Sequence, residues 1–113
     1  MGKYFEYKIN TQQIEKDLEK EIIKIANNNG FNGINYAYIT AHDNTTVVFK
    51  SSFEMIRTPS YDIENLVEKQ IRNTITSILN SDDVIAVNEI YEYKIKKTKN
   101  EYIITAEIDL NWM

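Results

Sequence analysis

The sequence predicts an α+β fold in which two helices pack on one face of a mainly antiparallel sheet. Two segments carry apolar residues at steps of three and four, which is typical of amphipathic helices. Other segments alternate apolar and polar residues between short polar turns, which is typical of antiparallel strands. The resulting order is β-αββ-αββ, and 113 residues, of which 42% are hydrophobic, suffice for one core. We therefore expect a single α+β domain over residues 1–113.

The first half begins with a short predicted strand over residues 4–9, followed by a helix that Asn10 or Thr11 can cap. The helix ends at NNNG (27–30), where Gly30 can adopt the left-handed conformation that closes many helices. One apolar stripe of this helix should enter the core: Ile14, Leu18, Ile22 and Ile25.

Residues 34–40 and 45–53 alternate as two strands around the polar turn AHDN. Pro59 and Ser60 then introduce a second helix, because proline suits the start of a helix and serine caps it. Its stripe consists of Ile63, Val67, Ile71, Ile75 and Ile78, widened by Leu66 and Leu79.

A long predicted hairpin closes the chain, with strands over 84–96 and 101–112 that turn at KTKN. The second of these strands has one apolar face, to which we assign the core residues Ile104, Ala106, Ile108 and Leu110. Its other face carries Thr105, Glu107, Asp109 and Asn111, with Ile103 as the apolar exception. The sheet should therefore have one packed face and one wet face.

The two halves resemble each other. IEKDLEKEI (14–22) begins the first helix and IENLVEKQI (63–71) begins the second. The tyrosine pair Tyr36 and Tyr38 likewise has a counterpart in Tyr91 and Tyr93. This similarity suggests an internal αββ repeat over 11–53 and 60–112, although helices rich in Ile, Glu and Lys also resemble one another by composition alone. The predicted architecture is the same in both cases.

The composition argues against several kinds of site. Without cysteine the chain has no disulfide or thiolate ligand, and no apolar run is long enough to span a membrane, so we expect a cytoplasmic protein. A net charge of −4 argues against nucleic acid as a partner. His42 is the lone histidine. Asp82 and Asp83 with Glu89 could hold a hard cation, but an Asp pair after a helix is more typical of a turn. We expect no catalytic, metal-binding or cofactor-binding residues, no small-molecule substrate, and no enzyme activity.

Tyrosines and lysines are the stronger candidates for a binding surface. Seven tyrosines fall in predicted strands: Tyr4, Tyr7, Tyr36, Tyr38, Tyr91, Tyr93 and Tyr102. Some should lie on the sheet face that the helices leave open, and tyrosine is favoured at protein interfaces. Four lysines gather at the tip of the last hairpin: Lys94, Lys96, Lys97 and Lys99. They could guard an exposed strand edge or meet acidic helix residues such as Glu64 and Glu68 of another copy.

The order from about residue 45 to the end also resembles a known class. The strand VVFKS, the helix DIENLVEKQIRNTITSIL and the hairpin NEIYEYKIKK…EYIITAEIDLNW are similar in layout to small ring-forming subunits of phage tails, particularly tail-terminator proteins. The helix and the hairpin opening VNEI also resemble small baseplate wedge subunits. The resemblance implies a structural subunit that assembles into a ring of copies, in the cytoplasm or within a phage-like particle. Its interface would use the hairpin, the tyrosines of the open face and the acidic residues of the second helix.

Two other functions fit the same chain. A small inhibitor or immunity protein would bind one partner through acidic helix residues: Glu15, Asp17, Glu19, Glu21, Asp62, Glu64 and Glu68. Lysines at 16, 20, 24 and 69 interleave with these acids, which is equally typical of a solvated helix surface. A nucleic-acid-binding module would use the hairpin tip at 94–99, which has no arginine or aromatic residue to stack on a base.

Overall fold

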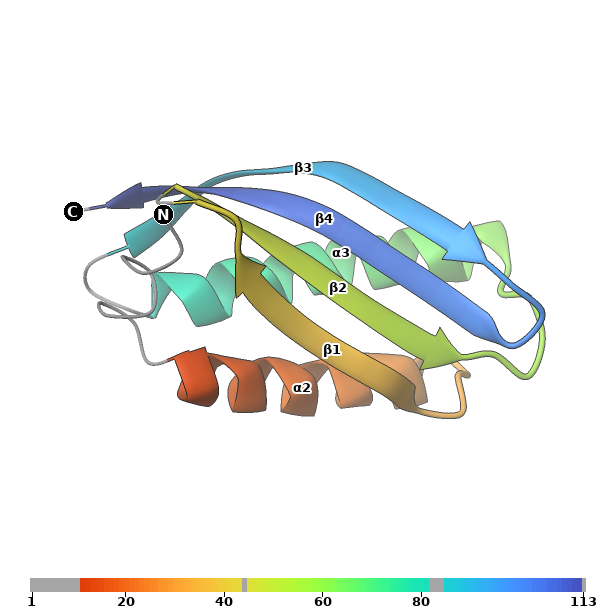
Figure 1. The fold of residues 1–113 in the computed structure, drawn as a ribbon. Coiled ribbons are helices and arrows are strands. Elements are labelled where there is room, and N and C mark those ends of the chain that lie inside the picture. Colours follow the sequence, from red (N-terminus) through yellow and green to blue (C-terminus); the bar gives the residue numbers. More distant parts are fainter. Residues whose placement is uncertain (1–10, 44, 82–84, 113) are drawn as a thin grey trace.

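The predicted α+β fold is confirmed. The computed structural model describes residues 11–43, 45–81 and 85–112, and the predicted strand over 4–9 lies outside them. The observed order is therefore αββ-αββ, with a single antiparallel sheet in the order β1-β2-β4-β3 (Figure 1). The elements are α2 (Thr11–Asn28), β1 (Ile34–Ala41), β2 (Thr46–Glu54), α3 (Tyr61–Asn80), β3 (Ile85–Lys97) and β4 (Glu101–Trp112).

Two of the predicted helix ends can be followed in detail, whereas Asn10, a predicted cap of the first helix, lies outside the described residues. The Ser60 side chain accepts a hydrogen bond from the Ile63 backbone N–H at 3.3 Å, so it caps α3 as expected. Helix α2 closes through Gly30, whose φ of +85° would strain any other residue. The Phe31 N–H then bonds back to the Ala26 carbonyl at 3.0 Å, which satisfies a carbonyl of the last turn.

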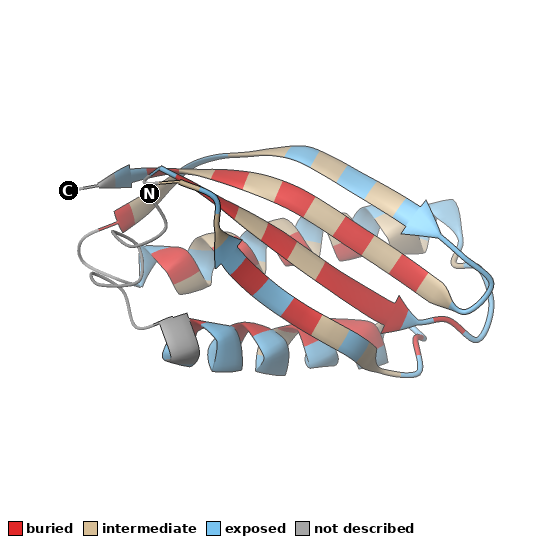
Figure 2. Cartoon of the chain, in the orientation of Figure 1, coloured by how far each residue is buried: buried red, intermediate tan, exposed pale blue. Residues whose placement is uncertain are grey.

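The core lies between the helix pair and one face of the sheet. Figure 2 shows buried and less buried residues alternating along β4, as expected for a strand with one packed face. The predicted core residues on α2, α3 and β4 are buried, except Ile63 and Ile78 of the α3 stripe, which are half-buried. Leu66 is 43% exposed and thus contributes little. An aromatic cluster of Phe31, Phe53 and Tyr102 fills the end of the core near the α2–β1 connection, with ring centroids 4.9–6.2 Å apart.

The two αββ units are arranged symmetrically. Strands β2 and β4 pair at the centre of the sheet, β1 and β3 lie at its edges, and α2 and α3 run in opposite directions beneath it (Figure 1). This is the arrangement of two like units about an approximate two-fold axis between β2 and β4. Duplication of the sequence remains a prediction.

Candidate functional site

The face of the sheet turned away from the helices is the candidate site, and we call it the open face. Paired residues on neighbouring strands point to the same side of a sheet, so the observed pairing arranges the open face in rows that cross the strands from β3 to β1. The first row holds Glu89, Asp109 and Thr46. The second row holds Tyr91, Glu107, Val48 and Thr40. The third row holds Lys94, Thr105, Lys50 and Tyr38. The fourth row holds Lys96, Ile103, Ser52 and Tyr36.

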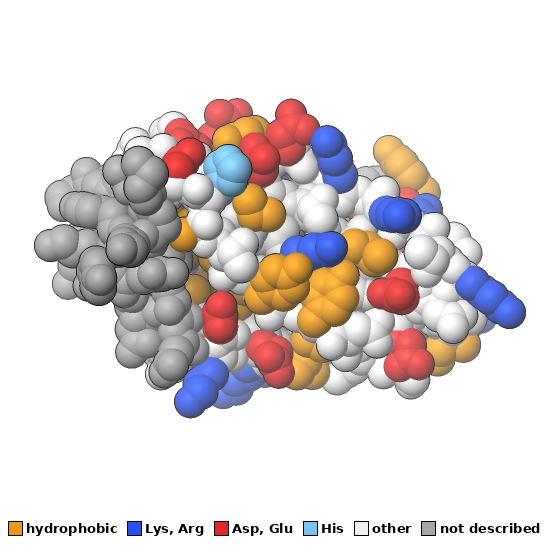
Figure 3. All heavy atoms as spheres, in the orientation of Figure 1, with side chains coloured by type: hydrophobic (Ala, Val, Ile, Leu, Met, Phe, Trp, Pro, Cys, Tyr) orange, Lys and Arg blue, Asp and Glu red, His pale blue; other side chains and the backbone are white. Residues whose placement is uncertain are grey.

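Aromatic side chains and a lysine meet near the β1 edge of this face. The rings of Tyr36 and Tyr38 lie 5.6 Å apart, and Lys50 Nζ lies 5.9 Å from the centroid of the Tyr36 ring. Figure 3 shows hydrophobic side chains near the middle of the face, crossed by a basic side chain and flanked by acidic ones. The open face thus combines apolar contact area with charges of both signs.

A β-bulge in β3 decides which tyrosines reach the open face. The pairing of β3 with β4 shifts between Tyr91 and Lys94, and Glu92 between them has a φ of +53°. The extra residue reverses the alternation, so Tyr91 lies on the open face whereas Tyr93 turns toward α3. The bulge also leaves a hollow of about 260 Å³ on the open face, lined by Tyr91, Glu107 and Lys94 among others.

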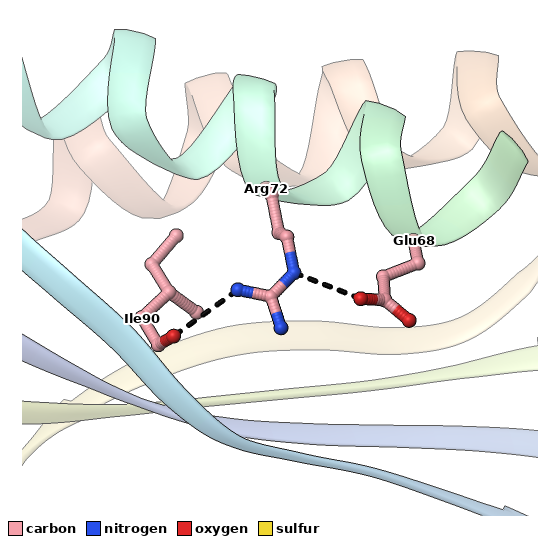
Figure 4. Close-up of polar contacts among 3 residues, drawn as sticks. All are labelled: Glu68, Arg72 and Ile90. Carbon is pink, nitrogen blue, oxygen red and sulfur yellow. Dashed lines mark hydrogen bonds and ion pairs between the residues drawn. The ribbon is translucent and has the colours of Figure 1, made fainter. Parts of the chain in front are cut away.

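The helix side of β3 holds a second group of polar residues. Arg72 of α3 donates from Nε to Glu68 at 3.0 Å and from one terminal nitrogen to the Ile90 carbonyl at 3.1 Å (Figure 4). Its guanidinium also lies 5.1 Å from the centroid of the Tyr93 ring. Together these contacts fasten α3 to the bulged part of β3.

The hairpin tip is fastened to the same layer. Lys97 forms an ion pair with Glu64 in the first turn of α3, and the Met55 backbone N–H donates to the Asn100 carbonyl at 2.7 Å. These contacts hold the hairpin tip against α3 and against the segment that follows β2. Lys97 and Glu64 already have a partner within the chain, as Glu68 has in Arg72, so meeting another copy would require breaking these pairs.

Two buried tyrosine hydroxyls belong to this layer. Tyr102 is fully buried, and neither its hydroxyl nor that of Tyr93 has a hydrogen-bond partner among the described residues. Burial raises the pKa of both groups well above the usual value, and nearby carboxylates, including Glu64 and Glu68, raise it further. On the open face, desolvation also raises the pKa of Tyr91.

The predicted interface residues are thus divided between two sides of the sheet. Tyr36, Tyr38, Tyr91, Lys94 and Lys96 lie on the open face. Tyr93, Lys97, Glu64 and Glu68 lie between the sheet and α3, and Lys99 is exposed in the hairpin turn.

Within the four rows, four charged residues were not predicted as interface residues: Lys50, Glu89, Glu107 and Asp109. The alternation of β4 places Glu107 and Asp109 on the wet face, and the alternation of β2 could have placed Lys50 there. Only the register between strands shows that all four lie near one another.

Other features of the described residues point to no further chemistry. No cluster of His, Asp or Glu in this part of the chain could hold a metal ion, while Asp82 and Asp83 lie outside it. His42 is exposed where β1 ends, and the neighbouring Asp43 has its pKa lowered by the Thr45 backbone N–H. Neither α2 nor α3 is long and apolar enough to cross a membrane. No protein-family model matches the chain, and no curated protein matches it in sequence.

Proposed function

We propose that this protein is a non-enzymatic assembly subunit that works by protein–protein contact, in the first place with copies of itself. The observation that carries the proposal is the open face, where a four-stranded sheet presents tyrosines and charges of both signs without a covering layer among the described residues. Tyrosine supplies rigid contact area at low entropic cost, which suits such a surface. Tyr38 is 36% exposed and is available for contact.

The resemblance to tail-terminator and baseplate subunits supports assembly into a ring, as part of a phage or phage-like contractile tail. A ring needs contacts that join two different surfaces of the subunit, and the two sheet edges differ in the required way. The β1 edge, INYAYITA, has no charge and no proline, and its one register shift lies at its start, between Ile34 and Tyr36. The β3 edge has lysines and two bulges, and Arg72 occupies its Ile90 carbonyl. Such features protect an edge from strand pairing, so β1 is the edge that favours it.

Light scattering and electron microscopy on concentrated protein test the proposal. Wild type should form oligomers, and the double variant Tyr36→Ala with Tyr38→Ala should weaken them without unfolding the chain. Tyr61→Ala is the matched control, because Tyr61 is 76% exposed but lies at the start of α3. A strictly monomeric protein that binds one foreign protein through its helices would contradict the proposal and favour the inhibitor or immunity function.

A further inference from the structure

The charges on the open face are separated by sign. Its first and second rows carry Glu89, Asp109 and Glu107 and no basic residue. The third and fourth rows carry Lys94, Lys50 and Lys96 and no acidic residue. Adjacent halves of one face therefore have opposite charge. If a second copy is rotated so that the two faces meet, its acidic half can lie against the basic half of the first copy, and the reverse.

We infer that the open face is a docking surface for a second copy of this chain. The two copies are related by a two-fold axis that runs across the strands, between the second and third rows. The inference rests on the proposed function, and it adds a contact between like faces to the contact between unlike surfaces that closes a ring. With this axis, the second row faces the third row of the other copy, and the first row faces the fourth. An axis along the strands would instead set each charged half against the same half, which costs free energy.

The axis across the strands places unlike groups opposite each other on β3. Glu89 faces Lys96 of the second copy, and Tyr91 faces Lys94 of the second copy, so an ion pair and a cation–π contact can form. At the centre, Glu107 faces the third row of the second copy between its Lys94 and Lys50. The hollow beside Tyr91 spans the second and third rows and therefore lies at the axis.

The remaining charges of the face do not oppose this arrangement. Glu54 and Glu101 pair in the row beyond the fourth, at the hairpin end of the sheet. The axis places them opposite the row of Ala86 and Asn111, which carries no charge. Glu92 lies in the bulge between the second and third rows, where the axis brings the two copies of β3 together, and its carboxylate is compensated by an ion pair with Lys94 of the same copy at 3.2 Å.

The size of the face suits a reversible pair. Strands about 4.8 Å apart with a rise of about 3.3 Å per residue give a footprint on the order of 650 Å² for this sheet. A typical stable interface buries about 800 Å² per partner, so we expect a dimer that dissociates on dilution. Two sheets packed face to face about 10 Å apart are a common arrangement in proteins.

A charge-swap experiment tests the inference by sedimentation equilibrium of the full chain. The first variant, Lys94→Glu with Lys96→Glu, makes both halves of the face acidic on β3. The second variant, Glu89→Lys with Glu107→Lys, makes both halves basic on β3 and reverses the charge of the second row on β4. Each variant alone should dimerise at least about tenfold more weakly than wild type, because like charges now meet. An equimolar mixture of the two should regain dimers, since the new glutamate at position 96 then faces the new lysine at position 89, and the new glutamate at position 94 lies beside the new lysine at position 107.

A control variant separates this contact from a general effect of charge. Lys16→Glu with Lys20→Glu makes the same change in net charge on the exposed surface of α2 and should leave dimerisation unchanged. If wild type self-associates but neither swap weakens it, or if the mixture fails to restore dimers, docking through the open face is wrong while the proposed function stands. A wild type that stays monomeric at the highest concentration overturns both.

Discussion

At the scale of single residues, the hydroxyl of Tyr102 is one of the buried polar groups that lack a hydrogen-bond partner among the described residues. The side chain is fully buried. A buried polar group without a partner costs about 1–3 kcal/mol, so removing it is expected to be neutral or stabilising. We predict that Tyr102→Phe keeps or raises the free energy of unfolding in urea at neutral pH. A loss of more than about 1 kcal/mol would mean that the hydroxyl is hydrogen-bonded.

The same burial makes stability depend on alkaline pH. The pKa values of Tyr93 and Tyr102 are raised in the folded protein above the ordinary value of 10.0, which applies in the unfolded chain. Above pH 10 the unfolded chain therefore loses protons that the folded protein keeps, and stability falls as pH rises. Each tyrosine can contribute a slope of up to about 1.4 kcal/mol per pH unit. Tyr93→Phe with Tyr102→Phe should flatten the decline in urea titrations between pH 9 and 11; an unchanged slope would contradict this origin.

The substitution Ile71→Ala tests how much the apolar stripe of α3 contributes to the stability of the core. Ile71 is fully buried, and a large-to-small change at such a site combines lost transfer free energy with a cavity. Ile71→Ala should lower the free energy of unfolding by about 2–5 kcal/mol in urea. Leu66→Ala on the same helix is the control and should cost less, because Leu66 is partly exposed. Equal effects of the two changes would show that α3 does not pack as described.

At the scale of elements, Arg72 is a polar link between α3 and β3, beside the Lys97–Glu64 ion pair and the hydrogen bond from the Val87 N–H to Asn80. It bonds to Glu68 on its own helix and to the Ile90 carbonyl on the strand, and it lies against the Tyr93 ring. Lysine cannot reproduce this forked geometry. We predict that Arg72→Lys lowers stability by about 1–2 kcal/mol and speeds amide exchange around the Glu92 bulge. Lys69→Arg, on an exposed position of α3, is the control, and equal exchange in both variants would contradict the link.

The elements also show how far local sequence patterns predict this fold. Helices α2 and α3 and strand β4 follow from periodicity, because burial on one side imposes a regular spacing within each segment. The separation of Tyr91 from Tyr93 does not follow, because it depends on a bulge defined by pairing with β4, at a residue, Glu92, that is not glycine. Local sequence patterns do not predict the rows of the open face either. They depend on the register between β2 and β4, which lie far apart in the sequence.

At the scale of the whole molecule, the two sides of the sheet differ in role: one side stabilises the fold, and the other is proposed to bind further copies. The side toward α2 and α3 carries the core and the internal polar contacts of Arg72 and Lys97. The open side carries the charged rows and the tyrosines proposed to meet other copies. Neighbouring residues of one strand can therefore serve different purposes, as side chains alternate between the two sides.

Lys96 and Lys97 provide the sharpest test of this division. Lys96 lies in the fourth row of the open face, while Lys97 pairs with Glu64, whose side chain is only 18% exposed. Lys97→Glu should lower the free energy of unfolding by about 1–2 kcal/mol, because it sets two carboxylates against each other in a partly buried place. Lys96→Glu should instead weaken self-association and leave stability within about 0.5 kcal/mol of wild type.

Urea unfolding and light scattering on both single variants give the comparison. Lys99→Glu, in the exposed hairpin turn, is the control for charge at this end of the molecule and should alter neither property. If the two lysines have the same effect on stability and on association, the two sides of the sheet do not divide these tasks. A loss of stability from Lys97→Glu and a loss of association from Lys96→Glu would be difficult to explain by net charge, since both changes alter it equally. This result would locate the assembly contact on the open face.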